Sequence, residues 1–121
     1  FRLGAQINVV YGADYAQLMG DPAFAARVVQ VANRNNLWRM VGKGRIDGVI
    51  ADENTGAYEI QQLGLSERIK PTAVVVSSDA AEIAFSKRSI EPDFVQAYAD
   101  ALRELVVDGR YERIVQRYIQ P

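Results

Sequence analysis

Segments with the pattern of β-strands alternate with helical segments along the first half of the chain, and this order constrains the fold more than any other feature. Apolar and polar residues alternate from Phe1 to Asn8, as in a half-buried strand. Val28–Val31 and the nearly continuous apolar run Ile46–Ala51 are typical of two further strands, the last of the buried, parallel kind. Helical patterns fill the intervals, so the sequence predicts an α/β fold with a largely parallel sheet flanked by helices.

Helix boundaries are marked by capping residues. We expect Asp14 to cap a short helix that Gly20 closes, and Asp21 with Pro22 to begin another turn. Other signals predict a helix after Asn33–Asn36, a helix from about 53 to 63, and two final helices: one that Pro92 begins and Gly109 ends, and one carrying Tyr111 to Ile119. The segments 72–77 and 82–86 are rich in apolar residues and are predicted to be a fourth and a fifth strand.

Composition excludes several classes of function. The 121 residues contain 14 Lys and Arg against 15 Asp and Glu, so no basic surplus favours nucleic acid as a partner. Cys and His are both absent, which excludes disulfides, thiol nucleophiles and catalytic triads that need imidazole. No apolar run is long enough to span a bilayer, and no segment matches a phosphate loop or a calcium loop, so we expect no cofactor and no metal.

Two places in the pattern are candidates for ligand binding, because ligands of open α/β sheets bind beyond the carboxyl ends of the strands. Asp52 follows the third strand, where its carboxylate either receives a ligand cation or caps the next helix. The loop Asn8, Val9, Val10 and Tyr11 follows the first strand, where it either holds a ligand carboxylate or is a plain connection with Val9 or Val10 packed inward. Trp38 is expected to pack in the core or on the surface rather than to clamp a ligand.

Two longer segments resemble a known family. The run from Leu37 to Asp52 contains GRIDGVIAD, and the end of the chain carries IAFSK at 83–87 followed by DGRYERIVQRY at 108–118. In this order they resemble the extracytoplasmic, or periplasmic, solute-binding proteins of ABC importers, in the polar amino-acid branch. The resemblance implies the type 2 periplasmic-binding-protein fold, in which two lobes joined by hinge strands close on a ligand.

The resemblance assigns the two parts of the chain to different lobes. Residues 1–79 are similar to the second lobe, and residues 80–121 are similar to the hinge return and the C-terminal helices of the first lobe. The N-terminal part of the first lobe is absent, and with it the aromatic side chains and the Arg that hold the ligand in the family. Since the chain begins with Phe1, we expect a processed product, a fragment or an engineered piece.

Site residues are carried over one by one. Asp52 matches the carboxylate that pairs with the ligand ammonium in amino-acid binders, and Asn8, Val9, Val10 and Tyr11 match the loop that meets the ligand's acid group. This loop departs from the family pattern of Gly with Ser or Thr, because Val10 and Tyr11 remove a hydroxyl and add bulk. The departure suggests a modified or different small polar solute.

The expected function is to bind a small polar solute, an amino acid or a related compound, and to deliver it to an ABC permease outside the cytoplasm. The alternatives are a ligand-sensing domain of a signalling protein and, less favoured because His is absent, a dehydratase-like enzyme on the same fold. We expect a binding protein and no enzyme.

The helices after residue 90 carry apolar faces that would pack against the absent part of the first lobe. They must either fold back on the chain's own second lobe or pair with a second copy by exchange across the hinge Ser77–Asp79. We expect the homodimer.

Overall fold

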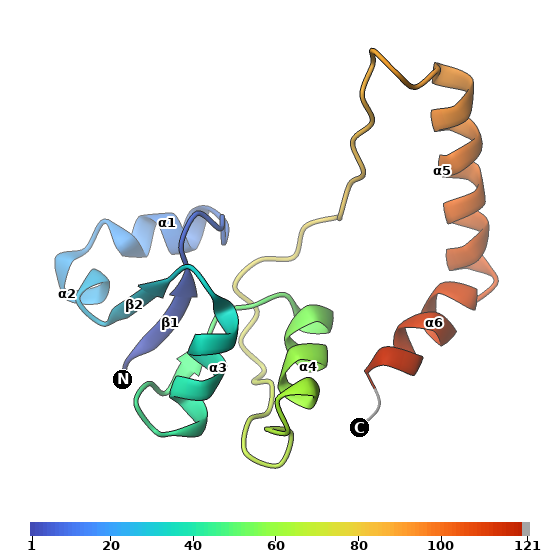
Figure 1. Cartoon of the computed structure of the whole chain (residues 1–121). Coiled ribbons are helices and arrows are strands. Elements are labelled where there is room, and N and C mark those ends of the chain that lie inside the picture. The colour runs from blue at the N-terminus through green and yellow to red at the C-terminus, as the bar shows by residue number, and fades with distance from the viewer. Residues whose placement is uncertain (120–121) are drawn as a thin grey trace. The chain divides into compact units, whose positions relative to one another are not determined.

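A computed structural model describes residues 1–119 and shows a mixed α/β chain (Figure 1). In chain order the elements are β1 (Leu3–Gln6), α1 (Ala13–Met19), α2 (Pro22–Ala25), β2 (Val28–Val31), α3 (Arg34–Gly42), β3 (Gly48–Val49), α4 (Glu53–Gln62), α5 (Pro92–Val107) and α6 (Arg110–Tyr118). The chain divides into two compact units at the bond between Ser78 and Asp79, and each is described by itself. The assignment of these units to lobes stays a prediction.

The first unit is built on a three-stranded parallel sheet in the order β2-β1-β3. Leu3 lies opposite Val28 on one side and opposite Gly48 on the other, so β1 is the central strand. The predicted α/β class with a parallel sheet is therefore confirmed. The third strand is shorter than the predicted 46–51, although backbone bonds from Asp47 to Arg2 and from Ile50 to Gly4 extend its pairing.

Helices cover both faces of this sheet. Successive residues of a strand point to opposite faces, so the neighbours of Gly4 and of Ala5 in β1 show what packs on each face. A Cβ on Gly4 would lie 2.8 Å from side-chain atoms of Leu37 and Ile46, so the face of Gly4 is packed closely against α3. Ala5 faces the other way, into a cluster with Tyr11 and Tyr15 next to α1. Both faces thus bury apolar side chains, as the α/β pattern requires.

The capping signals place most helix ends correctly. Asp21 and Asn33 accept hydrogen bonds from the backbone N–H two residues on, at 2.9 Å in both cases, and cap α2 and α3. The start of α2 is as predicted, whereas α3 begins at Arg34, inside the segment Asn33–Asn36 that was predicted to precede the helix. Gly109 has a φ of 77° and ends α5. Asp14 is a correction: α1 begins after Gly12, with a φ of 99°, and Asp14 lies in its first turn.

The fourth and fifth predicted strands are wrong. Residues 72–77, with bends at Ala73 and Val76, and residues 82–86 are irregular and pair with no strand in the part of the chain that the structure describes. Val74 and Val75 are 78% and 74% exposed, and Ile83 is 55% exposed. A β-rich composition forms a strand only when a neighbour supplies the hydrogen bonds, and these segments have no such neighbour within residues 1–119.

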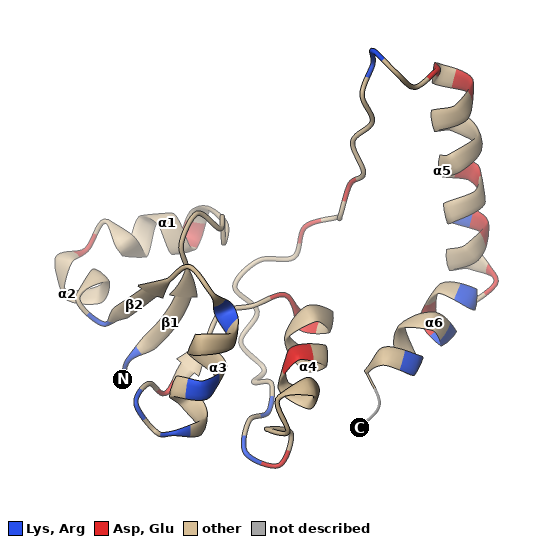
Figure 2. Cartoon of the chain, viewed as in Figure 1, with Lys and Arg blue, Asp and Glu red and all other residues tan. Residues whose placement is uncertain are grey.

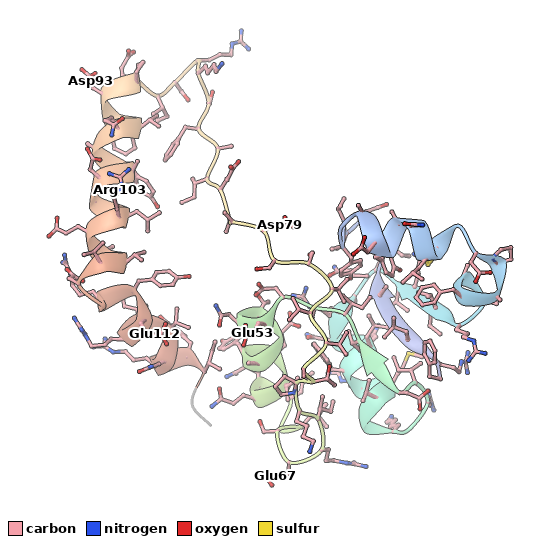
Figure 3. The ribbon with its side chains drawn as sticks, turned by 180° about the vertical axis from the view of Figure 1, so that it is seen from behind. Glu53, Glu67, Asp79, Asp93, Arg103 and Glu112 are labelled. Carbon is pink, nitrogen blue, oxygen red and sulfur yellow. The ribbon has the colours of Figure 1, made fainter. Side chains whose placement is uncertain are left out.

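The second unit consists of the helices α5 and α6 and the segment that precedes them. Phe85 packs edge-on against Phe94 and Tyr98, with ring centroids 5.9 and 5.2 Å apart. Side chains such as Asp93, Arg103 and Glu112 stand out from the two helices (Figure 3), and among the described residues of this unit none is buried. No helix within residues 1–119 has the length and apolar character needed to cross a membrane.

Candidate functional site

The candidate site is the edge of the sheet at which the three parallel strands end. β1 ends at Gln6, β2 at Val31 and β3 at Val49, and the segments that follow carry the polar side chains. Because all three strands run the same way, residues 7–12, 32–35 and 50–52 are brought to one edge. This edge also receives the N-terminal ends of α3 and α4 (Figure 1).

Asp52 is the N-cap of α4, which is the alternative that the sequence left open. One carboxylate oxygen, Oδ1, accepts a hydrogen bond of 2.8 Å from the backbone N–H of Thr55. The bond to Thr55 is the main reason that the pKa of Asp52 lies below its ordinary value, and the charge of Arg34 lowers the pKa further. The Asp52 side chain is exposed. A ligand contact by Asp52 therefore stays a prediction that its capping role allows.

The loop after β1 divides into an outward and an inward part. Asn8 has a left-handed backbone with a φ of 63°, and Val10 is 92% exposed, so Val10 does not pack inward. Val9 is also exposed. Tyr11 turns into the core, where its hydroxyl oxygen accepts a 2.8 Å bond from the backbone N–H of Gln6 and its ring lies 5.1 Å from that of Tyr15.

The four loop residues lie in two different environments. The core uses the ring and the hydroxyl of Tyr11, whereas Asn8, Val9 and Val10 lie at the surface. Ligand binding by the four residues stays a prediction.

An ion-pair network at the same edge was not predicted. Arg34, in the first turn of α3, donates from Nε and Nη2 to the two carboxylate oxygens of Glu59 in α4, at 2.7 and 2.8 Å. Trp38 donates from Nε1 to Glu59 Oε2 at 2.7 Å, and its ring is buried. The bidentate pair fixes the plane of the guanidinium and ties α3 to α4.

Burial and pairing set the charge states of this network. The Arg34 and Glu59 side chains are 20% and 21% exposed. The hydrogen bonds from Arg34 and then from Trp38 lower the pKa of Glu59, although partial burial acts the other way. The bond to Glu59 likewise raises the pKa of Arg34. The pair is therefore fully ionised near neutral pH and its charges cancel.

The sequence carries little signal for this network. Arg34 and Glu59 are 25 residues apart, and no periodicity links positions on two different helices. The sequence does predict that both helices follow parallel strands and so begin at the same edge of the sheet. This places Arg34 near Asp52, but it does not identify Glu59 as the partner of Arg34.

The network borders a shallow hollow of about 250 Å3. Its walls are formed by the ends of β1 and β2, the start of α3 and the side of α4, and the lining residues are Gln6, Ala32, Asn33, Arg34, Asn35 and Glu59. In Figure 2 the start of α3 is basic and the start of α4 is acidic. No group of three metal-ligating side chains occurs among residues 1–119.

The arrangement offers hydrogen bonds and a rigid, neutralised ion pair to a small polar molecule. Asp52 and Glu59 both have lowered pKa values, so neither is suited to donate a proton as a general acid near neutral pH. No family model, no curated protein and no solved structure matches the chain.

Proposed function

We propose that the chain is the ligand-binding part of an extracytoplasmic solute-binding protein of an ABC importer, with the type 2 periplasmic-binding-protein fold. The proposal joins the sequence resemblance to one structural observation. The GRIDGVIAD segment ends at Asp52, which lies in the short connection from β3 to α4 at the carboxyl edge of the parallel sheet. This is the edge where ligands of open α/β sheets bind.

The expected ligand is a small polar solute, an amino acid or a related compound. An exposed carboxylate that stays ionised at neutral pH is suited to an ammonium group, and Asp52 has these properties. The surface residues Asn8, Val9 and Val10 flank the same edge. We propose a binding role and not an enzymatic one; the lowered pKa values of Asp52 and Glu59 do not suit a general acid near neutral pH.

The complete reading frame that encodes this chain tests the proposal. We expect a secretory or lipoprotein signal before it, the rest of the first lobe, and no signalling domain after it.

A thermal-shift screen of the protein encoded by that frame is the second test. The purified protein should show a saturable increase in melting temperature with at least one of the amino acids and related polar solutes screened. A signalling domain downstream would favour the sensor, and turnover of a screened compound would favour the enzyme.

A further inference from the structure

The hollow beside Arg34 offers both hydrogen-bond donors and acceptors but carries almost no net charge. Glu59 accepts from Arg34 Nε, Arg34 Nη2 and Trp38 Nε1, so its two oxygens are already engaged. The positive charge of Arg34 is matched by that carboxylate at 2.7 Å. A charged ligand group placed here would meet a neutral pair with no counter-charge to spare.

Arg34 still presents one edge to the hollow. Its Nη1 atom carries two N–H donors. Within the described residues, the structure records one side-chain contact of Nη1, a weak hydrogen bond of 3.5 Å to Gln6 Oε1. Gln6 is held by its own amide nitrogen, which donates to the carbonyl oxygen of Ala32 at 3.0 Å. The orientation of that amide leaves Gln6 Oε1 as an acceptor beside the guanidinium.

Two further amides complete the lining. Asn33 Oδ1 accepts from the backbone N–H of Asn35 at 2.9 Å, which leaves the amide nitrogen of Asn33 as a donor. The structure records no hydrogen bond of the Asn35 side chain within residues 1–119. The volume of about 250 Å3 exceeds the roughly 30 Å3 share of one water several times, so a group of several atoms fits.

We propose that this hollow binds an uncharged group that both donates and accepts hydrogen bonds, a primary carboxamide. Its carbonyl oxygen accepts from Arg34 Nη1 and the Asn amides, and its NH2 group donates to Gln6 Oε1. The inference deepens the proposed function, on which it rests: the solute carries a carboxamide in addition to the group that meets Asp52.

The single tryptophan gives a direct readout. The chain has one Trp, so its indole N–H yields one resonance, and that N–H donates to Glu59, which holds Arg34. We would titrate the isotope-labelled 121-residue chain with propionamide and, separately, with propionate and propylammonium at equal ionic strength. Propionamide should shift the indole signal and the backbone signals of Asn33 and Asn35 saturably in the millimolar range, whereas the two ions should not.

Asn35→Ala and Asn36→Ala are the matched variants, since both residues are exposed in the first turns of α3 and Asn35 alone of the two lines the hollow. Loss of one hydrogen bond should weaken propionamide binding about fivefold in Asn35→Ala, and Asn36→Ala should bind as the parent does. Equal shifts with all three probes, no saturable shift with propionamide, or equal affinity in both variants overturns the inference. A solute without a carboxamide that binds the complete protein would overturn it as well while leaving the proposed function in place.

Discussion

At the scale of single residues, Glu59 is the hub of the candidate site. It receives three hydrogen bonds from two side chains and joins α3 to α4. Its side chain is about four-fifths buried, so its loss leaves a partly desolvated guanidinium and an indole N–H without their charged acceptor.

Glu59→Gln should therefore destabilise the chain by about 1–3 kcal/mol, less than a fully buried pair because water reaches both groups. Urea unfolding followed by Trp38 fluorescence measures the change. Glu67→Gln is the control, since Glu67 is exposed in the segment after α4 (Figure 3) and surface substitutions usually change stability by less than about 0.5 kcal/mol. Equal unfolding free energies of the two variants would contradict the assigned role of Glu59.

The pH dependence of stability follows from the same residue. The pKa of Glu59 is lower in the folded chain than its ordinary value of 4.5, chiefly because Arg34 donates to it. A carboxyl with a depressed folded pKa stabilises the fold above its unfolded pKa, and this contribution is lost as the pH falls through the folded pKa. The unfolding free energy should therefore fall on acidification below about pH 4.5. The fall should be shallower in Glu59→Gln, and parallel pH profiles of parent and variant would count against the pairing.

At the scale of the elements, the structure shows which predicted features depend on neighbouring residues alone and which depend on distant ones. The start of α2 and the end of α5 were predicted correctly, because Asp21 and Gly109 act on backbone groups within a few residues. The strands 72–77 and 82–86 were wrong, because a strand needs a neighbour that no local signal guarantees. The ion pair of Arg34 with Glu59 was missed for a similar reason: it joins two residues on different helices that are 25 positions apart in the sequence.

The capping of α4 by Asp52 gives a test at this scale. Asp52→Ala removes the acceptor of the Thr55 N–H and should cost about 0.5–2 kcal/mol of stability. Asp52→Asn keeps a side-chain oxygen at the cap and should retain most of that stability. Thermal or urea unfolding of the two variants checks the order. If Asn destabilised as much as Ala, the carboxylate charge and not the cap would be the important feature of Asp52.

At the scale of the whole molecule, the two units differ in how they bury apolar side chains. The first unit has a core around Ala5, Leu37 and Ile46, which are at most 2% exposed. The second unit has no buried side chain among its described residues. On α5 and α6, Phe94, Val106 and Ile114 are between 46% and 55% exposed. Apolar surface of this kind is usually covered by a further part of the protein or by a partner.

We expect the 121-residue chain in isolation to form a homodimer that covers these helices. Light scattering over a dilution series should give twice the mass of 13.4 kDa at high concentration and a fall toward that mass on dilution. Phe94→Ser should shift the equilibrium toward the monomer. A monomer mass at every concentration, together with cooperative unfolding, would show instead that the chain folds back on itself.

The most direct test of the central claim is the ligand affinity of the complete protein with and without the carboxylate of Asp52. Asp52→Asn keeps the cap of α4 and removes the charge, and Asp47→Asn is the control, because Asp47 bonds to Arg2 at the opposite end of β3. Calorimetry with the solute found in the screen should show binding weakened by about 2–5 kcal/mol in Asp52→Asn and unchanged in Asp47→Asn. Equal affinities of parent and Asp52→Asn would contradict the claim that this edge of the sheet binds the solute.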